Sequence, residues 1–103
     1  MAEYERFWKL AERMLEMDPT LERGTIMGMG CLRTGGKFVA GPWHDGIVVK
    51  LNRARVQEVM AGGGLPFAPA GKIFREWVVA PAAREEMWPE LIEEAARLAQ
   101  ASG

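Results

Sequence analysis

The chain has 103 residues and a mass of 11.4 kDa, so we expect residues 1–103 to form one small domain. Hydrophobic residues make up 49% of it and charged residues 26%, which is ordinary globular usage and excludes a disordered chain. Thirteen basic and fourteen acidic residues leave a net charge of −1, which at first argues against a binder of polyanions.

Side chains that could carry catalysis are scarce. Cys31 is the only cysteine, His44 the only histidine, and Ser102 the only serine. A serine triad therefore lacks a suitable nucleophile, and a Cys31–His44 pair would need the fold to bring the two together. One cysteine and one histidine cannot build a structural zinc site without several carboxylates. We predict no enzymatic activity, no catalytic residue, no metal and no cofactor.

The start of the chain does not resemble a signal peptide. Seven charged residues interrupt residues 1–17, so an apolar signal core is missing there. No stretch approaches the roughly 18 apolar residues that a membrane span needs. We therefore expect a cytoplasmic protein that makes no membrane contact.

Residues 2–17 are predicted to form the first helix. Its apolar residues recur at the spacing of one helical face: Tyr4, Phe7, Trp8, Ala11, Met14 and Leu15. Asp18-Pro19 ends the helix, because proline disfavours the α conformation of the residue before it. We expect Tyr4, Phe7, Trp8, Trp77 and Trp88 to lie in the core.

The next part of the chain is typical of strands. We predict one strand over 26–33, a tight turn at Gly35-Gly36 and a second strand over 37–40. Trp43 and His44 fall in a predicted loop, and the β-branched run 47–51 predicts a third strand.

A short helix over 53–61 follows, with Asn52 as its N-cap. The segment 66–69 should be extended, 73–79 should be a strand, and 87–101 should be the last helix. This order predicts a two-layer α+β fold, α-β(3)-α-β(2)-α, with helices covering one face of an antiparallel sheet.

Several segments resemble the N-terminal domain of the TfoX family. The resemblance rests on the runs 26–32, 36–41, 48–51, 66–67 and 71–79, and on Trp88 in the last helix. It implies the same α-β(3)-α-β(2)-α arrangement, which is also similar to that of secretion chaperones. It further implies a link to the regulation of DNA uptake and competence genes, without defining a molecular activity.

Four positions depart from the family's pattern: Met27, Met29, Ile73 and Glu76 stand where the family usually has Phe, Gly, Pro and Gly. The family's helical C-terminal half has no counterpart before Gly103, so we expect a stand-alone domain. The resemblance predicts a bacterial, non-enzymatic regulatory domain that contacts an unknown protein partner, and we expect it to form a homodimer.

The net charge conceals an uneven distribution. Residues 23–75 hold eight basic and two acidic residues, whereas acidic residues outnumber basic ones in 1–22 and in 76–103. The most concentrated part of the basic region lies at the start of the short helix and comprises Lys50, Asn52, Arg53 and Arg55. The free N–H groups at the start of a helix also attract anions. The hypothesis is an anion site there; the competing interpretation is that these arginines pair with glutamates of the terminal helices or lie in water.

Direct binding of nucleic acid or of an anionic ligand through Lys50, Arg53 and Arg55 is therefore the alternative function. No helix-turn-helix, zinc finger or aromatic RNA-binding motif supports it. Cys31 is expected to be a buried small side chain, although Arg33, two residues on, shares its face of the strand. We expect His44 to be exposed to solvent. The methionines are an alternative source of an adaptable binding surface.

Overall fold

A computed structural model describes residues 2–101, with side chains from residue 4 onward. The elements in chain order are α1 (Ala2–Met17), β1 (Glu22–Ile26), β2 (Met29–Thr34), β3 (Lys37–Trp43), β4 (Gly46–Lys50), α2 (Arg53–Ala61), β5 (Leu65–Pro66), β6 (Trp77–Ala80), the 3-10 turn η1 (Ala82–Met87) and α3 (Trp88–Ala101). The strands form one six-stranded sheet in the order β1-β2-β3-β4-β6-β5, and every neighbouring pair is antiparallel.

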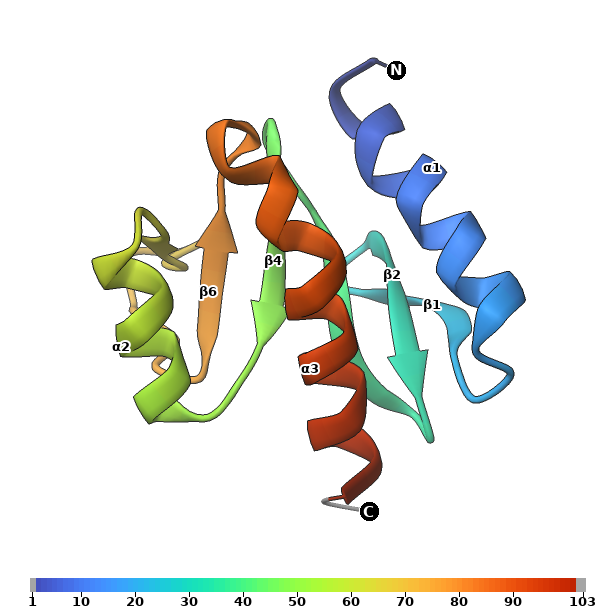
Figure 1. Cartoon of the computed structure of the whole chain (residues 1–103). Helices are drawn as coiled ribbons and strands as arrows, with labels where there is room; N and C mark the ends of the chain where they lie inside the picture. The colour runs from blue at the N-terminus through green and yellow to red at the C-terminus, as the bar shows by residue number, and fades with distance from the viewer. Residues whose placement is uncertain (1, 102–103) are drawn as a thin grey trace.

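The main core lies between the helices and one face of the sheet. Helix α3 crosses the middle of that face, with α1 and α2 on opposite sides of it (Figure 1). Phe7 of α1, Val59 of α2 and Ile92 of α3 are each at most 1% exposed in this core. The Trp88 indole also donates a buried hydrogen bond of 3.2 Å to the carbonyl oxygen of Ala80, which joins the start of α3 to β6.

A second, smaller core occupies the other face of the sheet. Residues 67–76, here called the covering segment, contribute Phe67 and Phe74 to it. Phe67 is fully buried, and its ring contacts those of Trp43, Phe74 and Trp77 at centroid distances of 4.8, 5.3 and 5.4 Å. Side chains that alternate along the central strands therefore bury on both faces, as in Ile47-Val48-Val49 of β4.

The fold class predicted from the sequence is confirmed: helices pack on an antiparallel sheet in an α+β domain. The predicted number of strands between the first two helices is wrong, because four strands precede α2 instead of three. The expected strand over 26–33 is interrupted by a turn at Met27-Gly28, whose φ angles are 52° and 76°. Two positive φ angles define the type I′ turn that joins hairpin strands, so β1 and β2 pair with Ile26 opposite Met29.

Two further boundaries differ from the predicted ones. Strand β3 continues through Gly41-Pro42 to Trp43, which leaves only His44 and Asp45 in the expected loop. The predicted strand over 73–79 begins at Trp77, because the preceding residues turn back on themselves. The Phe74 amide donates to the Phe67 carbonyl at 2.9 Å, and the Trp77 amide donates to the Phe74 carbonyl at 3.2 Å.

The helices agree with the sequence. Helix α1 ends at Met17, where the Asp18 carboxylate accepts hydrogen bonds from the amide and hydroxyl of Thr20 at 3.0 and 2.6 Å. The expected core is confirmed for Phe7 and Trp88, whereas Trp8 and Trp77 are half-buried and Tyr4 is 40% exposed. No helix within residues 2–101 is long and apolar enough to cross a bilayer.

Candidate binding groove beside the middle helix

Asn52 begins α2 as its sequence predicts. Its backbone is extended, and its side-chain oxygen accepts a hydrogen bond of 2.9 Å from the Arg55 amide. This cap satisfies one of the free N–H groups that would otherwise attract an anion. Asn52 therefore serves the helix itself.

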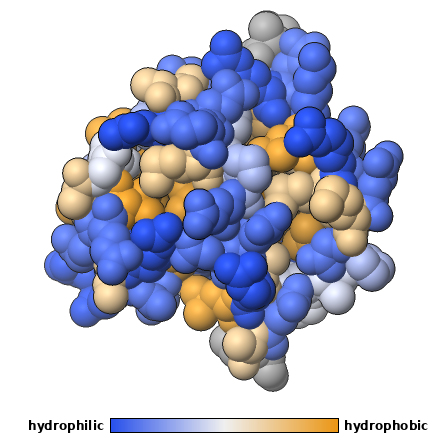
Figure 2. All heavy atoms as spheres, in the orientation of Figure 1, coloured by the Kyte–Doolittle hydropathy of each residue, from blue (hydrophilic) through white to orange (hydrophobic). Residues whose placement is uncertain are grey.

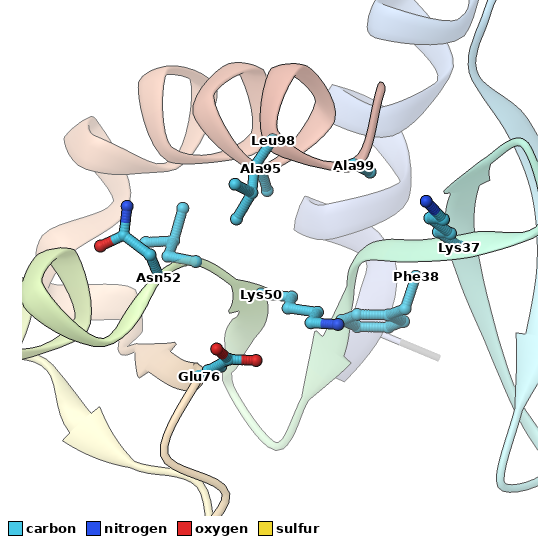
Figure 3. Close-up of a pocket in the computed structure, with 9 residues that line it drawn as sticks. Lys37, Phe38, Lys50, Asn52, Glu76, Ala95, Leu98 and Ala99 are labelled. Atoms are coloured by element: carbon cyan, nitrogen blue, oxygen red, sulfur yellow. The ribbon is translucent and has the colours of Figure 1, made fainter. Parts of the chain in front are cut away.

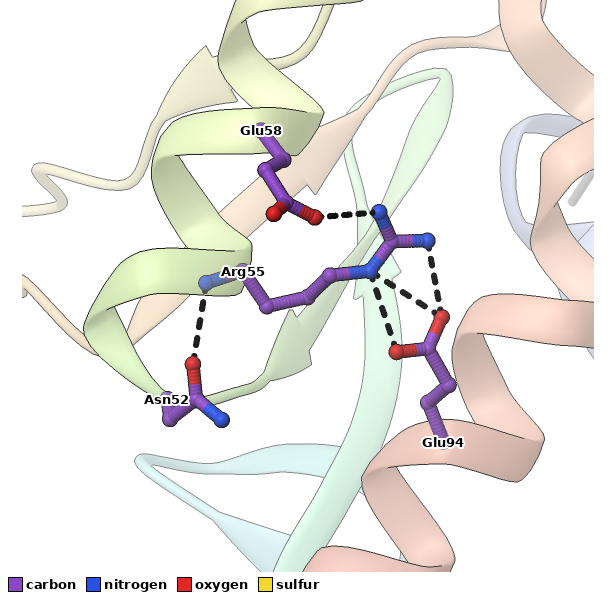
Figure 4. Close-up of polar contacts among 4 residues, drawn as sticks. All are labelled: Asn52, Arg55, Glu58 and Glu94. Carbon is purple, nitrogen blue, oxygen red and sulfur yellow. Dashed lines mark hydrogen bonds and ion pairs between the residues drawn. The ribbon is translucent and has the colours of Figure 1, made fainter.

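Arg55 is held by carboxylates of the same chain (Figure 4). Its Nε donates to both oxygens of Glu94 at 3.1 and 3.0 Å, and its Nη2 donates to Glu94 Oε1 at 2.8 Å. Its Nη1 donates to Glu58 Oε1 at 3.0 Å. The hydrogen bonds that Arg55 donates to Glu94, and then the one it donates to Glu58, raise the pKa of Arg55 above its ordinary value. The competing interpretation, pairing with a glutamate of a terminal helix, is thus the correct one for Arg55.

Helix geometry separates the two arginines that the sequence places together. Residues two positions apart on an α-helix project to different sides. Arg55 projects toward Glu94 of α3, whereas Arg53 lines hollows on the side of the covering segment. The four predicted residues therefore do not form one site.

Lys50 and Asn52 line a small pocket of about 170 Å³ where β4 leads into α2 (Figure 3). Lys37 and Glu76 lie on its wall, and Ala95 and Leu98 of α3 close it on the helix side. The pocket combines amino groups with a carboxylate, so its charge is mixed.

A larger depression lies between α2 and the chain that leads from the covering segment into β6. It consists of two adjoining hollows of about 500 and 540 Å³ that share Arg53, Ile73, Phe74, Arg75 and Trp77. We call it the basic groove. Its apolar wall also includes residues of α2 and β5, namely Ala54, Val56, Met60 and Pro66.

Four cations and one carboxylate line the basic groove: Lys50, Arg53, Lys72, Arg75 and Glu76. Arg53, Lys72 and Arg75 are exposed, and none of the four cations makes an ion pair with any residue in the described range. Ile73 within the groove is 56% exposed and the neighbouring Leu65 is 52% exposed. The groove thus combines uncompensated positive charge with apolar surface.

Sequence reasoning missed Lys72 and Arg75 as members of this site. It placed 73–79 in a strand, where neighbouring side chains would alternate between two faces. Gly71, whose φ is 84°, is a turn signal in the sequence. The fold of the covering segment, however, also depends on the contact between the rings of Phe67 and Phe74.

Cys31 and His44 lie in different surroundings, one buried in β2 and the other exposed at a turn. Cys31 is fully buried, and burial raises the pKa of its thiol, with Arg33 opposing that rise. The Arg33 side chain lies over Gly24 of β1, where a Cβ on residue 24 would collide with it. Arg33 and Cys31 can therefore lie on the same face of β2 while Cys31 stays buried. His44 is exposed at the β3–β4 turn and contacts the ring of Trp43, and Ser102 lies outside the described residues.

A separate apolar hollow of about 410 Å³ lies between α1 and α3, with Leu10, Met14 and Met17 on its wall. Figure 2 shows hydrophobic residues between the hydrophilic ones in the region between these helices. Arg13, Asp18, Glu93 and Arg97 also line it, so its charges balance. Of the methionines that the sequence suggests for a binding surface, Met14 and Met17 line this hollow and Met60 lines the basic groove.

Comparison of the chain with protein-family models, with curated proteins and with solved structures finds no match. The resemblance to the TfoX N-terminal domain therefore stays a prediction from the sequence.

Proposed function

We propose that this chain is a non-enzymatic bacterial regulatory domain that acts by binding a partner protein. The observation that carries the proposal is the basic groove, where Ile73 is 56% exposed beside four cations that make no ion pair within residues 4–101. Contiguous exposed apolar surface with a polar rim is typical of interaction sites. The cytoplasmic location and the link to competence regulation remain predictions from the sequence.

Nucleic acid is the weaker candidate for the same surface. Trp77 already stacks on Phe38 at 4.2 Å and on Phe67 at 5.4 Å between ring centroids, so its ring faces are used within the chain. Single-stranded nucleic acid usually needs free aromatic faces on which bases stack. The acidic residues of α3 would also repel a long polyanion that extended beyond the groove.

In-cell photocrosslinking tests the proposal. The change is Ile73→p-benzoylphenylalanine, with Lys9→p-benzoylphenylalanine on exposed α1 as the matched control. We expect discrete adducts with a protein from position 73 and none of the same mass from position 9. Adducts that are removed by nuclease would support nucleic acid instead, and the absence of any adduct specific to position 73 would refute the proposal.

A further inference from the structure

The basic groove has a more apolar part and a more cationic part, which share five of their lining residues. One part is apolar, with Val56 and Met60 of α2 facing Ile73 and Phe74 of the opposite wall. The other part is cationic, with Lys50, Lys72 and Arg75 around Glu76. Arg53 lines both, so a ligand in the apolar part comes within reach of the cations.

We propose that the basic groove binds an acidic peptide segment of the partner that carries at least one large apolar side chain. This proposal rests on the proposed function and deepens it by naming the chemistry of the partner. The apolar side chain would enter the hollow between α2 and Ile73, and flanking carboxylates would meet Arg53, Lys72 and Arg75.

Charge complementarity selects this occupant over a basic or a neutral one. The cations lack an internal partner among the described residues, so carboxylates would pair with them without breaking an existing ion pair. Guanidinium groups favour carboxylates because two parallel N–H donors match the two oxygens. Arg55 illustrates this geometry inside the same molecule, on Glu94.

The apolar wall selects a peptide over a free anion or a nucleic acid. Phosphate or an oligonucleotide backbone would leave Ile73, which is 56% exposed, uncovered by apolar surface. A leucine, phenylalanine or methionine side chain would bury it. The peptide is thus recognised by an anchor side chain, and its charges set the affinity and the preference among sequences.

The test begins with selection of peptides from a random dodecapeptide library on the full chain. We expect the selected peptides to be enriched in aspartate and glutamate around a large apolar residue. A synthetic peptide of the selected sequence should bind at least about tenfold more weakly when its acids become amides or its apolar residue becomes serine. Selection of peptides without acidic enrichment, or of none, would overturn the proposal.

Paired charge reversals locate the binding site. Arg53→Glu with Arg75→Glu should weaken binding of the selected peptide by at least about tenfold, whereas Lys9→Glu with Arg13→Glu changes the net charge equally and should leave it unchanged. Equal effects of the two pairs would overturn the proposal. Circular dichroism of both variants shows whether they remain folded, and Ile73→Ser, at an exposed position, gives an independent loss of binding if Arg53 or Arg75 proves structural.

The two proposals fail in different ways. Protein adducts from position 73 together with peptides that lack acidic residues would keep the protein-interaction function and remove the acidic ligand. Binding of a ten-residue oligothymidine in place of the acidic peptide, with the same sensitivity to Arg53→Glu and Arg75→Glu, would refute both.

Discussion

Met27 is a single residue whose backbone conformation conflicts with its side chain. It occupies a φ of 52° in the β1–β2 turn, where residues with a Cβ are strained and asparagine is tolerated best. Its side chain is 59% exposed, so little packing depends on it. The sequence pattern gave no sign of this turn, because methionine is not a turn former.

We predict that Met27→Asn raises the free energy of unfolding by about 0.5–1 kcal/mol, since asparagine-glycine suits a type I′ turn. Urea denaturation followed by circular dichroism measures the change. Met17→Asn, at an exposed position that needs no positive φ, serves as the control. A stability of Met27→Asn at or below the wild-type value would contradict the strain argument.

Cys31 makes stability depend on pH in a defined direction. Burial raises the pKa of its thiol from the ordinary 9.0, so the folded state holds the proton more tightly than the unfolded state. Its contribution is fully present below pH 9.0 and is lost as the pH rises beyond it. We predict that the stability difference between the wild type and Cys31→Ala narrows between about pH 7.5 and about pH 10.

Urea denaturation of both proteins at the two pH values tests this, because other groups titrate equally in the pair. A difference that stays constant or widens with pH would show that the thiol is not protected in the folded state. Labelling by a thiol reagent provides a second readout, and it should be slow until the chain unfolds.

At the scale of elements, the short helix α2 is tied to α3 by one ion pair. Arg55 and Glu94 are 30% and 25% exposed in their side chains and lie 2.8 Å apart. We predict that Glu94→Gln lowers the free energy of unfolding by about 1 kcal/mol, because a paired, partly buried arginine loses its carboxylate. Glu93→Gln, at an exposed position, should change it by less than about 0.5 kcal/mol.

Urea denaturation of the two variants is the measurement. Similar changes at both positions would show that the ion pair contributes nothing specific. The same pair of variants should bind the selected acidic peptide as the wild type does, since Arg55 does not line the basic groove.

At the scale of the whole molecule, β1 forms one end of the sheet, and among residues 2–101 it pairs only with β2. An edge strand with a free side can pair with another chain. We therefore predict a homodimer, with twice the 11.4 kDa mass of the chain, in light scattering at about 100 μM protein. Thr25→Lys, at an exposed position of β1, should return the mass to 11.4 kDa, because an edge lysine disfavours strand pairing.

Ala83→Lys adds the same charge at an exposed position of η1 and should leave the dimer intact. A wild-type mass of 11.4 kDa at that concentration would contradict the prediction. So would a dimer that is equally insensitive to both lysines, because the contact would then lie elsewhere.

The acidic and basic residues that nearly cancel in the net charge lie on different parts of the folded chain. Helices α1 and α2 lie on opposite sides of α3 (Figure 1), so the basic groove beside α2 is separated from acidic residues of α1. Glu94 of α3 pairs with Arg55 outside the groove, and the four cations that line the groove come from three segments of the chain. Near-neutrality is a cancellation between different parts of the surface.

The sequence by itself determined the elements that depend on neighbouring residues. The periodic apolar residues of α1 and α3, the Asn52 cap and the Gly35-Gly36 turn are all local features, and each was predicted where it lies. The α+β class followed from their order. Local signals decide such features because helix faces, caps and glycine turns involve residues at most a few positions apart.

The tertiary structure alone decided which charges remain available. Arg55 and Glu94 are 39 positions apart, and Phe67 buries beside Trp43 and Trp77 only because the covering segment folds across the sheet. That packing brings Lys72 and Arg75 to Arg53, whereas the helix turns Arg55 away. Of the cations that line the basic groove, Lys50 and Arg53 were predicted from the sequence. Lys72 and Arg75 could not be predicted, because they reach the groove through contacts between segments far apart in the chain.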